Sequence, residues 1–131
     1  MTDPYFIWGV DRINPNNKVK YSKPIVIIIN ELDFSGGDFF PAILQDNKRA
    51  TIVGSRTAGA GGYVNSIAFP NSFGFAGISF TGSIGERTDK NPIENLGVTP
   101  DVEIKLTVED VRKGFTQYLG KVKSTVDSLI K

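Results

Sequence analysis

Two chemically active residue types are missing from this sequence. It contains neither cysteine nor histidine. Without cysteine, the chain cannot form a disulfide, a thiolate metal site or a cysteine nucleophile. Without histidine, it cannot by itself supply the imidazole base on which many hydrolytic mechanisms depend. A histidine-dependent hydrolysis would therefore need a group from outside this sequence.

A strong charge bias and a long apolar run are missing as well. The formal net charge is +1 over 131 residues, so the composition gives no reason to expect a nucleic-acid partner. No apolar run approaches the length of a membrane span. The opening "MTDPYFIWG" lacks the charged and apolar regions of a signal peptide. We expect no membrane span and no targeting signal, so the protein stays in the cytoplasm or the chain is part of a longer protein.

What is present is the pattern of one α/β domain over residues 1–131. The run "PIVIIIN", 24–30, is typical of a strand covered on both faces. A helix is predicted from Gly36 to Gln45, and "ATIVG", 50–54, predicts a second strand. Strand, helix and strand indicate a parallel pair with a right-handed crossover. Pro41 predicts an irregular first helical turn, and the expected buried side chains of the helix are Phe39, Phe40, Ile43 and Leu44.

The second half of the chain predicts a hairpin and a helix. Residues 63–69 and 73–87 read as two antiparallel strands joined by a Pro-Asn turn, and 102–106 as a short strand. Thr107 and Asp110 match a capping box. The apolar residues that follow recur every three or four positions, which predicts one long amphipathic C-terminal helix over 107–131. Residues 1–23, including Trp8, show no clear period and are interpreted as a lead-in segment.

The corner "DFSGG", residues 33–37, joins the first strand to the first helix. Serine is a leading N-cap residue, and Asp38 three positions later imitates a capping box. The same position also suits a nucleophile, because a helix N-terminus directs unpaired N–H groups at a developing oxyanion. Gly36 would be one such donor, and Gly36 and Gly37 would let a substrate backbone approach. From these residues alone, both roles of Ser35 stay open.

Several ordered motifs carry a family resemblance. "KPIVIIIN", "GDFFPAILQDN", "TAGAGG", "FTGS" and "IENLGVTP" follow one another between residues 23 and 105. In this order they resemble the C-terminal processing, or tail-specific, serine peptidases, with the greatest likeness to the chlamydial protease-like activity factor subgroup. The resemblance implies an α/β fold of the crotonase/ClpP-like, ββα-superhelix kind. It also implies that the chain is the C-terminal portion of such a peptidase domain.

The resemblance also assigns roles to single residues. Common tail-specific peptidases use a Ser-Lys dyad, but the lysine position is Ala60 here, and neither Lys48 nor Arg56 matches it. The chlamydial subgroup uses a Ser-His-Glu triad, which implies Ser35 as nucleophile and Glu94 as the carboxylate. Its histidine and the second oxyanion donor would come from an upstream segment. Without the resemblance, the favoured interpretation of Glu94 is a loop carboxylate that caps or pairs locally, since exposed carboxylates are common.

Other positions near the corner receive weaker assignments. A substrate-binding strand would be shaped by Gly59, Gly61 and Gly62. An apolar substrate groove would lie near Phe39, Tyr63 and the strand over 73–84. Asp46 is interpreted as structural, closing the helix and pairing locally with Lys48 or Arg49.

We therefore expect part of a serine endopeptidase that acts through an acyl-enzyme, with the isolated chain inactive because it has no base. Its partners would be a peptide or protein substrate and the upstream part of the same protein. Association of identical copies is left open. Neither metal nor cofactor is implied, and the resemblance implies a secreted or periplasmic location. The alternative is a non-catalytic pseudopeptidase or a peptide-binding or assembly module, in which Ser35 is only a helix cap.

Overall fold

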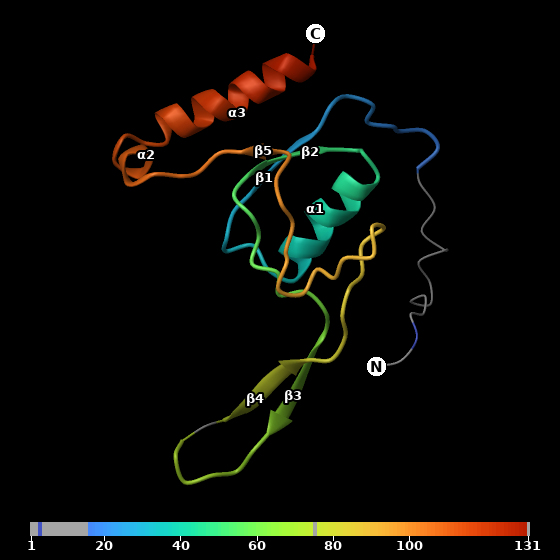
Figure 1. Ribbon diagram of the computed structural model, residues 1–131, viewed down its shortest axis with the longest axis vertical. Coiled ribbons are helices and arrows are strands. Elements are labelled where there is room, and N and C mark those ends of the chain that lie inside the picture. The colour runs from blue at the N-terminus through green and yellow to red at the C-terminus, as the bar shows by residue number, and fades with distance from the viewer. Residues whose placement is uncertain (1–2, 4–15, 75, 131) are drawn as a thin grey trace.

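A computed structural model describes residue 3 and residues 16–74 and 76–130. Most of the predicted lead-in segment, Trp8 included, therefore lies outside the described residues. The described chain comprises a small α/β unit, a hairpin that projects from one end of it and a pair of helices beside the other end (Figure 1).

The α/β unit is built on a three-stranded parallel sheet. Its strands are β1 (Val26–Ile29), β2 (Thr51–Gly54) and β5 (Val102–Glu103), in the order β1-β2-β5. Helix α1 (Gly36–Asp46) connects β1 to β2 (Figure 1). The predicted parallel strand–helix–strand unit is therefore confirmed. Because β2 is central, Ile52 and Val53 are both fully buried although their side chains leave opposite faces of the sheet.

Helix α1 buries only part of the predicted face, because Phe39 and Leu44 are half-buried while Phe40 and Ile43 are not. Pro41 and Ala42 are buried, whereas Phe40 and Ile43 are 59% and 57% exposed. The prediction followed side-chain size, whereas the fully buried positions of the helix hold the small residues Pro41 and Ala42 together with Asp38. The helix continues through Pro41, and its first turn contains short-range bonds from Gly37 N–H to the Phe34 carbonyl and from Asp38 N–H to the Ser35 carbonyl.

The hairpin consists of β3 (Val64–Ala68) and β4 (Gly77–Thr81), paired antiparallel with Val64 opposite Thr81 and Ala68 opposite Gly77. This confirms the predicted antiparallel pair, although β4 is much shorter than the predicted strand over 73–87. All five residues of β4 are exposed, and β3 is exposed except at half-buried Asn65.

The predicted single C-terminal helix is wrong, because the chain forms α2 (Val108–Arg112) and α3 (Thr116–Leu129). The predicted capping box at Thr107 and Asp110 is confirmed at the start of α2. The helix then ends in a Schellman arrangement, in which Phe115 N–H donates to the Asp110 carbonyl and Gly114 N–H to that of Val111. Gly114 and Phe115 both have φ near 63°, and these two left-handed residues cannot continue a right-handed helix.

Among the described residues, the hydrophobic core lies in the α/β unit and in the segments on either side of β5. One cluster of buried side chains connects β1, β2 and α1 to the segment before β5. Its members are Ile29, Ala42, Ile52, Ile93 and Val98. Among the described residues, no helix has the length and apolar character needed to cross a membrane.

Candidate functional site

Ser35 stands at the corner between β1 and α1 in an unusual backbone conformation, with φ 54° and ψ −114°. Its side chain forms no capping bond, so the predicted N-cap role is wrong. The residue is exposed, and its N–H donates to the Ala60 carbonyl at 3.0 Å. A non-glycine residue in this region is strained, and such strain persists only where the surrounding structure over-determines it. The corner thus presents the serine at the carboxyl end of β1 instead of using it to cap α1.

The two glycines after Ser35 differ in their surroundings. A Cβ atom built on Gly36 would meet no heavy atom within 4 Å, so open space lies beside this residue. A Cβ atom on Gly37 would lie 3.1 Å from Cβ of Asp33. Within the described residues Gly36 N–H has no hydrogen-bond acceptor. At the N-terminus of an eleven-residue helix, this free donor is available to an anionic oxygen beside Ser35.

Asp38 does not complete the predicted capping box. It is fully buried, and its carboxylate binds the loop after β2. Oδ1 accepts hydrogen bonds from Thr57 Oγ1 at 2.5 Å and from Gly59 N–H at 3.0 Å, and Oδ2 accepts one from Ala60 N–H at 2.9 Å. Sequence reasoning missed this role, and the only signal was a carboxylate placed among the apolar residues of a helix.

Glu94 is half-buried and its two carboxylate oxygens differ. Oε1 accepts a long hydrogen bond of 3.3 Å from Thr81 Oγ1, at the end of β4. Oε2 is buried and has no hydrogen-bond partner among the described residues. Leaving a buried carboxylate oxygen unpaired is costly, so this oxygen is suited to a donor that the described chain does not provide.

The loop of residues 57–61 connects Ser35 to the turn that carries Glu94. The Ala60 carbonyl accepts from Ser35 N–H, and the Gly59 carbonyl accepts from Asn95 N–H at 2.7 Å. Gly59 has φ 72°, and a Cβ atom there would lie 2.6 Å from the N atom of Gly97. The two predicted site residues therefore lie on segments that bind one loop through adjacent carbonyl groups.

The basic residues near this loop do not provide a dyad partner. Ala60, which the resemblance assigns to the lysine position of the common tail-specific peptidases, is exposed. Arg56 donates from Nη1 to the carbonyl oxygens of Asn95 at 3.2 Å and Leu96 at 2.9 Å, so it holds the turn after Glu94. Lys48 lies beyond the far end of α1. Sequence reasoning did not assign this tethering role to Arg56, because its acceptors are backbone atoms forty positions away.

Gly61 and Gly62 have packing roles. A Cβ atom on Gly61 would lie 3.2 Å from the Phe39 ring and 3.0 Å from Cγ2 of Ile93. Gly62 has φ 86°, and a Cβ atom there would lie 2.1 Å from the carbonyl oxygen of Ser83. Close packing at the base of the hairpin thus accounts for glycine at both positions. Their predicted contact with substrate stays a prediction.

Asp46 is structural, but its predicted local partners are wrong. Its carboxylate forms an ion pair with Arg87, which also donates to Gln45 Oε1 at 2.8 Å. Both side chains of the pair are largely buried. The Arg87 guanidinium holds the pKa of Asp46 below its ordinary value of 3.8. This pair fastens the far end of α1 to the segment after β4.

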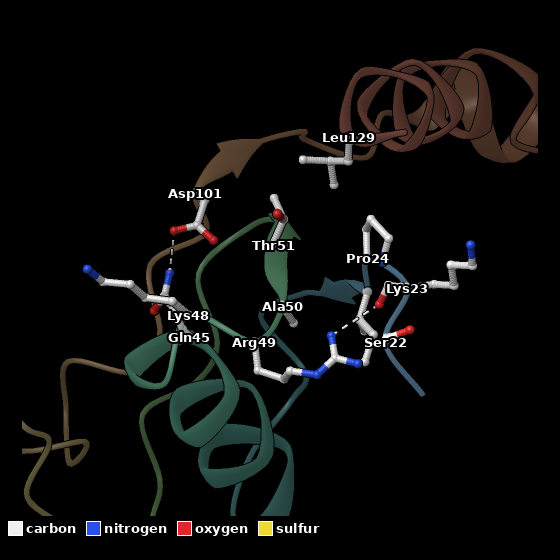
Figure 2. Close-up of a pocket in the computed structure, with 11 residues that line it drawn as sticks. Ser22, Lys23, Pro24, Gln45, Lys48, Arg49, Ala50, Thr51, Asp101 and Leu129 are labelled. Atoms are coloured by element: carbon white, nitrogen blue, oxygen red, sulfur yellow. Dashed lines mark hydrogen bonds between the residues drawn. The ribbon is translucent and has the colours of Figure 1, made fainter. Parts of the chain in front are cut away.

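A separate pocket of about 460 Å³ lies at the opposite end of the sheet, where β1 and β2 begin. Figure 2 shows Arg49 pointing toward the Lys23 carbonyl, Gln45 hydrogen-bonded to Asp101 and Leu129 of α3 across the opening. Neither Ser35 nor Glu94 lines this pocket. It is therefore distinct from the corner that carries the candidate catalytic groups.

The sequence of residues 9–104 matches peptidase family S41, and the chain belongs to this family. The parallel sheet, the Ser35 corner and the Glu94 turn all lie within the matched residues.

Individual relatives confirm the predicted likeness to chlamydial proteins. A protein of Chlamydia trachomatis serovar D is 49% identical over 99% of this chain, which covers 22% of that protein. A solved structure of mature CPAF complexed with lactacystin superimposes with a TM-score of 0.83 at 52% identity, over 90% of this chain and 23% of that one. A carboxy-terminal-processing protease of Bartonella bacilliformis is 27% identical over 76% of this chain and 22% of its own length. The chain thus spans about a fifth of the length of these relatives.

Proposed function

We propose that this chain contributes the nucleophile and the carboxylate of a tail-specific-type serine endopeptidase. The observation that carries the proposal is the conformation of Ser35, which is strained, exposed and free of any capping bond at the start of α1. A structural serine at this position would cap the helix and avoid that strain. Membership of peptidase family S41 supports the same reaction class.

The proposed mechanism assigns one step to each group. An imidazole from outside this sequence takes the Ser35 proton while Oγ attacks the peptide carbonyl carbon. The developing oxyanion accepts a hydrogen bond from Gly36 N–H, and a second donor comes from the segment that supplies the imidazole. Collapse of the tetrahedral intermediate expels the amine, which takes the proton from the imidazolium. Water then hydrolyses the acyl-enzyme by the same route.

Glu94 completes the proposed triad. Its buried Oε2 would accept the second imidazole N–H, which fixes the tautomer and stabilises the imidazolium. The sequence has no histidine, so the chain alone cannot perform the reaction and is proposed to be inactive in isolation. The substrate is a peptide or protein, and the complete enzyme is secreted or periplasmic.

A second candidate is a non-catalytic peptide-binding or assembly module. It is favoured by the absence of histidine and by large exposed apolar side chains next to the corner, Leu32 at 79% and Phe34 at 65% exposure. Such side chains bind partners in many proteins. Under this alternative the corner would still bind peptides, but Ser35 would not become acylated.

Fluorophosphonate labelling separates the two candidates. The longest native gene product that contains this sequence is treated with the reagent and the modified residue is located by mass spectrometry. We expect labelling at Ser35, its loss in Ser35→Ala and its persistence in Ser22→Ala, which alters an exposed serine at the other end of the sheet. The 131-residue chain alone should remain unlabelled. Failure to label the long product would leave the binding module as the better description.

A further inference from the structure

We propose that Asp38 is a positioning residue that sets the placement of Ser35 relative to Glu94 through the 57–61 loop. The inference rests on the proposed function, because it concerns the geometry of that same site. Asp38 does not touch the reacting atoms in this proposal. It acts through the backbone of the loop between the two site residues.

The Asp38 carboxylate is buried and hydrogen-bonded to the loop. The residue is 0% exposed, and the described residues provide three donors to its two oxygens, namely one hydroxyl and two backbone N–H groups. A buried carboxylate is retained at such cost only where its hydrogen bonds compensate for desolvation. Since all three donors belong to the loop, the negative charge fixes the loop against the first turn of α1.

Thr57 connects Asp38 to the segment after Glu94. Its Oγ1 donates to Asp38 and accepts from Val98 N–H at 2.7 Å, and both bonds are buried. Thr57 N–H in turn donates to the Val98 carbonyl at 3.2 Å. One hydroxyl thus joins the buried carboxylate to the chain four residues after Glu94.

The loop also presents two adjacent carbonyl groups, those of Gly59 and Ala60, to the segments that carry the site residues. The residues whose N–H groups bind Asp38, Gly59 and Ala60, are the same residues whose carbonyls bind Asn95 and Ser35. The Gly59–Ala60 peptide directs its N–H at the carboxylate and its carbonyl at Asn95, and the next carbonyl along the chain, that of Ala60, accepts from Ser35 N–H. A shift of the loop would therefore move both segments, and misplacement by about 1 Å can cost on the order of 10²-fold in rate.

Asn cannot replace the carboxylate in this arrangement. Two oxygens of Asp38 receive three donors, whereas an amide offers one oxygen and places an NH₂ group against a donor. The amide of Asp38→Asn has two possible orientations. In one its NH₂ group faces Ala60 N–H, and in the other it faces the Thr57 and Gly59 donors. The predicted result is a loosened loop with the helix and sheet retained.

The test compares Asp38→Asn with Asp101→Asn in the longest native gene product. Asp101 is a matched control because its carboxylate also accepts a backbone N–H, from Ile52, and a side-chain donor, from Gln45, away from the corner. We expect Asp38→Asn to slow acylation of Ser35 by fluorophosphonate, and to lower kcat on a peptide substrate, on the order of 10²-fold with KM changed less than about threefold. Asp101→Asn should leave both rates within about threefold.

Two variants of Thr57 test the same connection if Asp38→Asn fails to fold. Thr57→Val removes the bridging hydroxyl and Thr57→Ser retains it. We expect Thr57→Val to slow acylation about tenfold or more and Thr57→Ser to remain near the unaltered protein. Equal rates for the Val and Ser variants would overturn the proposal, as would an unchanged kcat in folded Asp38→Asn.

Amide hydrogen exchange separates this proposal from the proposed function. Exchange at Ser35, Gly59, Ala60 and Asn95 should accelerate about tenfold or more in Asp38→Asn, and stay unchanged in Asp101→Asn. If the unaltered protein does not react with fluorophosphonate, the proposed function fails, yet this exchange pattern would still support the positioning of the two segments by Asp38. Unaltered exchange at Ser35 and Asn95 in Asp38→Asn would overturn it even in an active enzyme.

Discussion

The α/β unit and its appendages differ in how they bury apolar surface. Strands β1 and β2, helix α1 and the segment before β5 share one core, in which Ile52 and Val98 have no exposed surface. Within the part of the chain that the structure describes, the β3–β4 hairpin and the C-terminal helices contribute no hydrophobic residue to that core, and their largest apolar side chains are mostly about half exposed or more. Stability in the described chain is therefore concentrated in the unit that carries Ser35.

This difference explains where a strained residue can be held. The Ser35 corner is fixed on one side by β1 and α1, and on the other by a loop that a buried carboxylate restrains. A core of this density supports strain because its parts cannot relax independently. The hairpin and α3 lack such support among the described residues. We therefore expect matched substitutions to have large effects in the unit and small ones in the appendages.

The largest contrast is expected between two glycines. In Gly54→Ala the new Cβ atom would lie 1.9 Å from the Ile29 carbonyl oxygen, at a φ of +125°. Gly120, inside α3, has no heavy atom within 4 Å of a built Cβ atom. Chemical unfolding should show Gly54→Ala lowering the free energy of unfolding by more than about 4 kcal/mol. Gly120→Ala should leave it unchanged or raise it by up to about 1 kcal/mol. Comparable losses in both variants would contradict the contrast.

Two isoleucines test the same contrast through packing. Ile52 is fully buried at the centre of the sheet, whereas Ile67 in β3 is 51% exposed. Ile52→Ala should cost about 2–5 kcal/mol of unfolding free energy, because it removes buried surface and leaves a cavity. Ile67→Ala should cost less than about 1 kcal/mol. Denaturant melts followed by circular dichroism would measure both. A loss of several kcal/mol for Ile67→Ala would show that the hairpin packs against something beyond the described residues.

Local patterns predicted the regular elements better than they predicted the site. The apolar run over 24–30 and the capping box at Thr107 involve neighbouring residues, so sequence reasoning found both. The break at Gly114 and Phe115 was missed because the apolar period continues through it. Asp38 was assigned to a local cap because its true partners lie about twenty positions away. The family resemblance assigned the proposed roles of Ser35 and Glu94, but no local pattern indicated the loop between them.

The smallest contrast concerns two ion pairs. Asp46 pairs with Arg87 in a largely buried setting, whereas Asp127 pairs with Lys123 on the exposed face of α3 at 2.5 Å. Asp46→Asn should lower the free energy of unfolding at pH 7 by roughly 1–2 kcal/mol, since it weakens hydrogen bonds to a charged group. Asp127→Asn should lower it by about 0.3–0.5 kcal/mol, an effect that salt removes.

The dependence on pH sharpens this last contrast, because folding lowers the pKa of Asp46 through the Arg87 guanidinium. A carboxylate with a lowered pKa stabilises the fold fully above its unfolded value, which is near 3.8, and loses that contribution as pH falls through its folded pKa. The difference between the unaltered protein and Asp46→Asn should therefore be constant from pH 7 to about pH 5 and should shrink below about pH 4. Urea unfolding at a series of pH values measures it. A difference that persists undiminished to pH 2 would mean that the loss arises from packing of the amide and not from the ion pair.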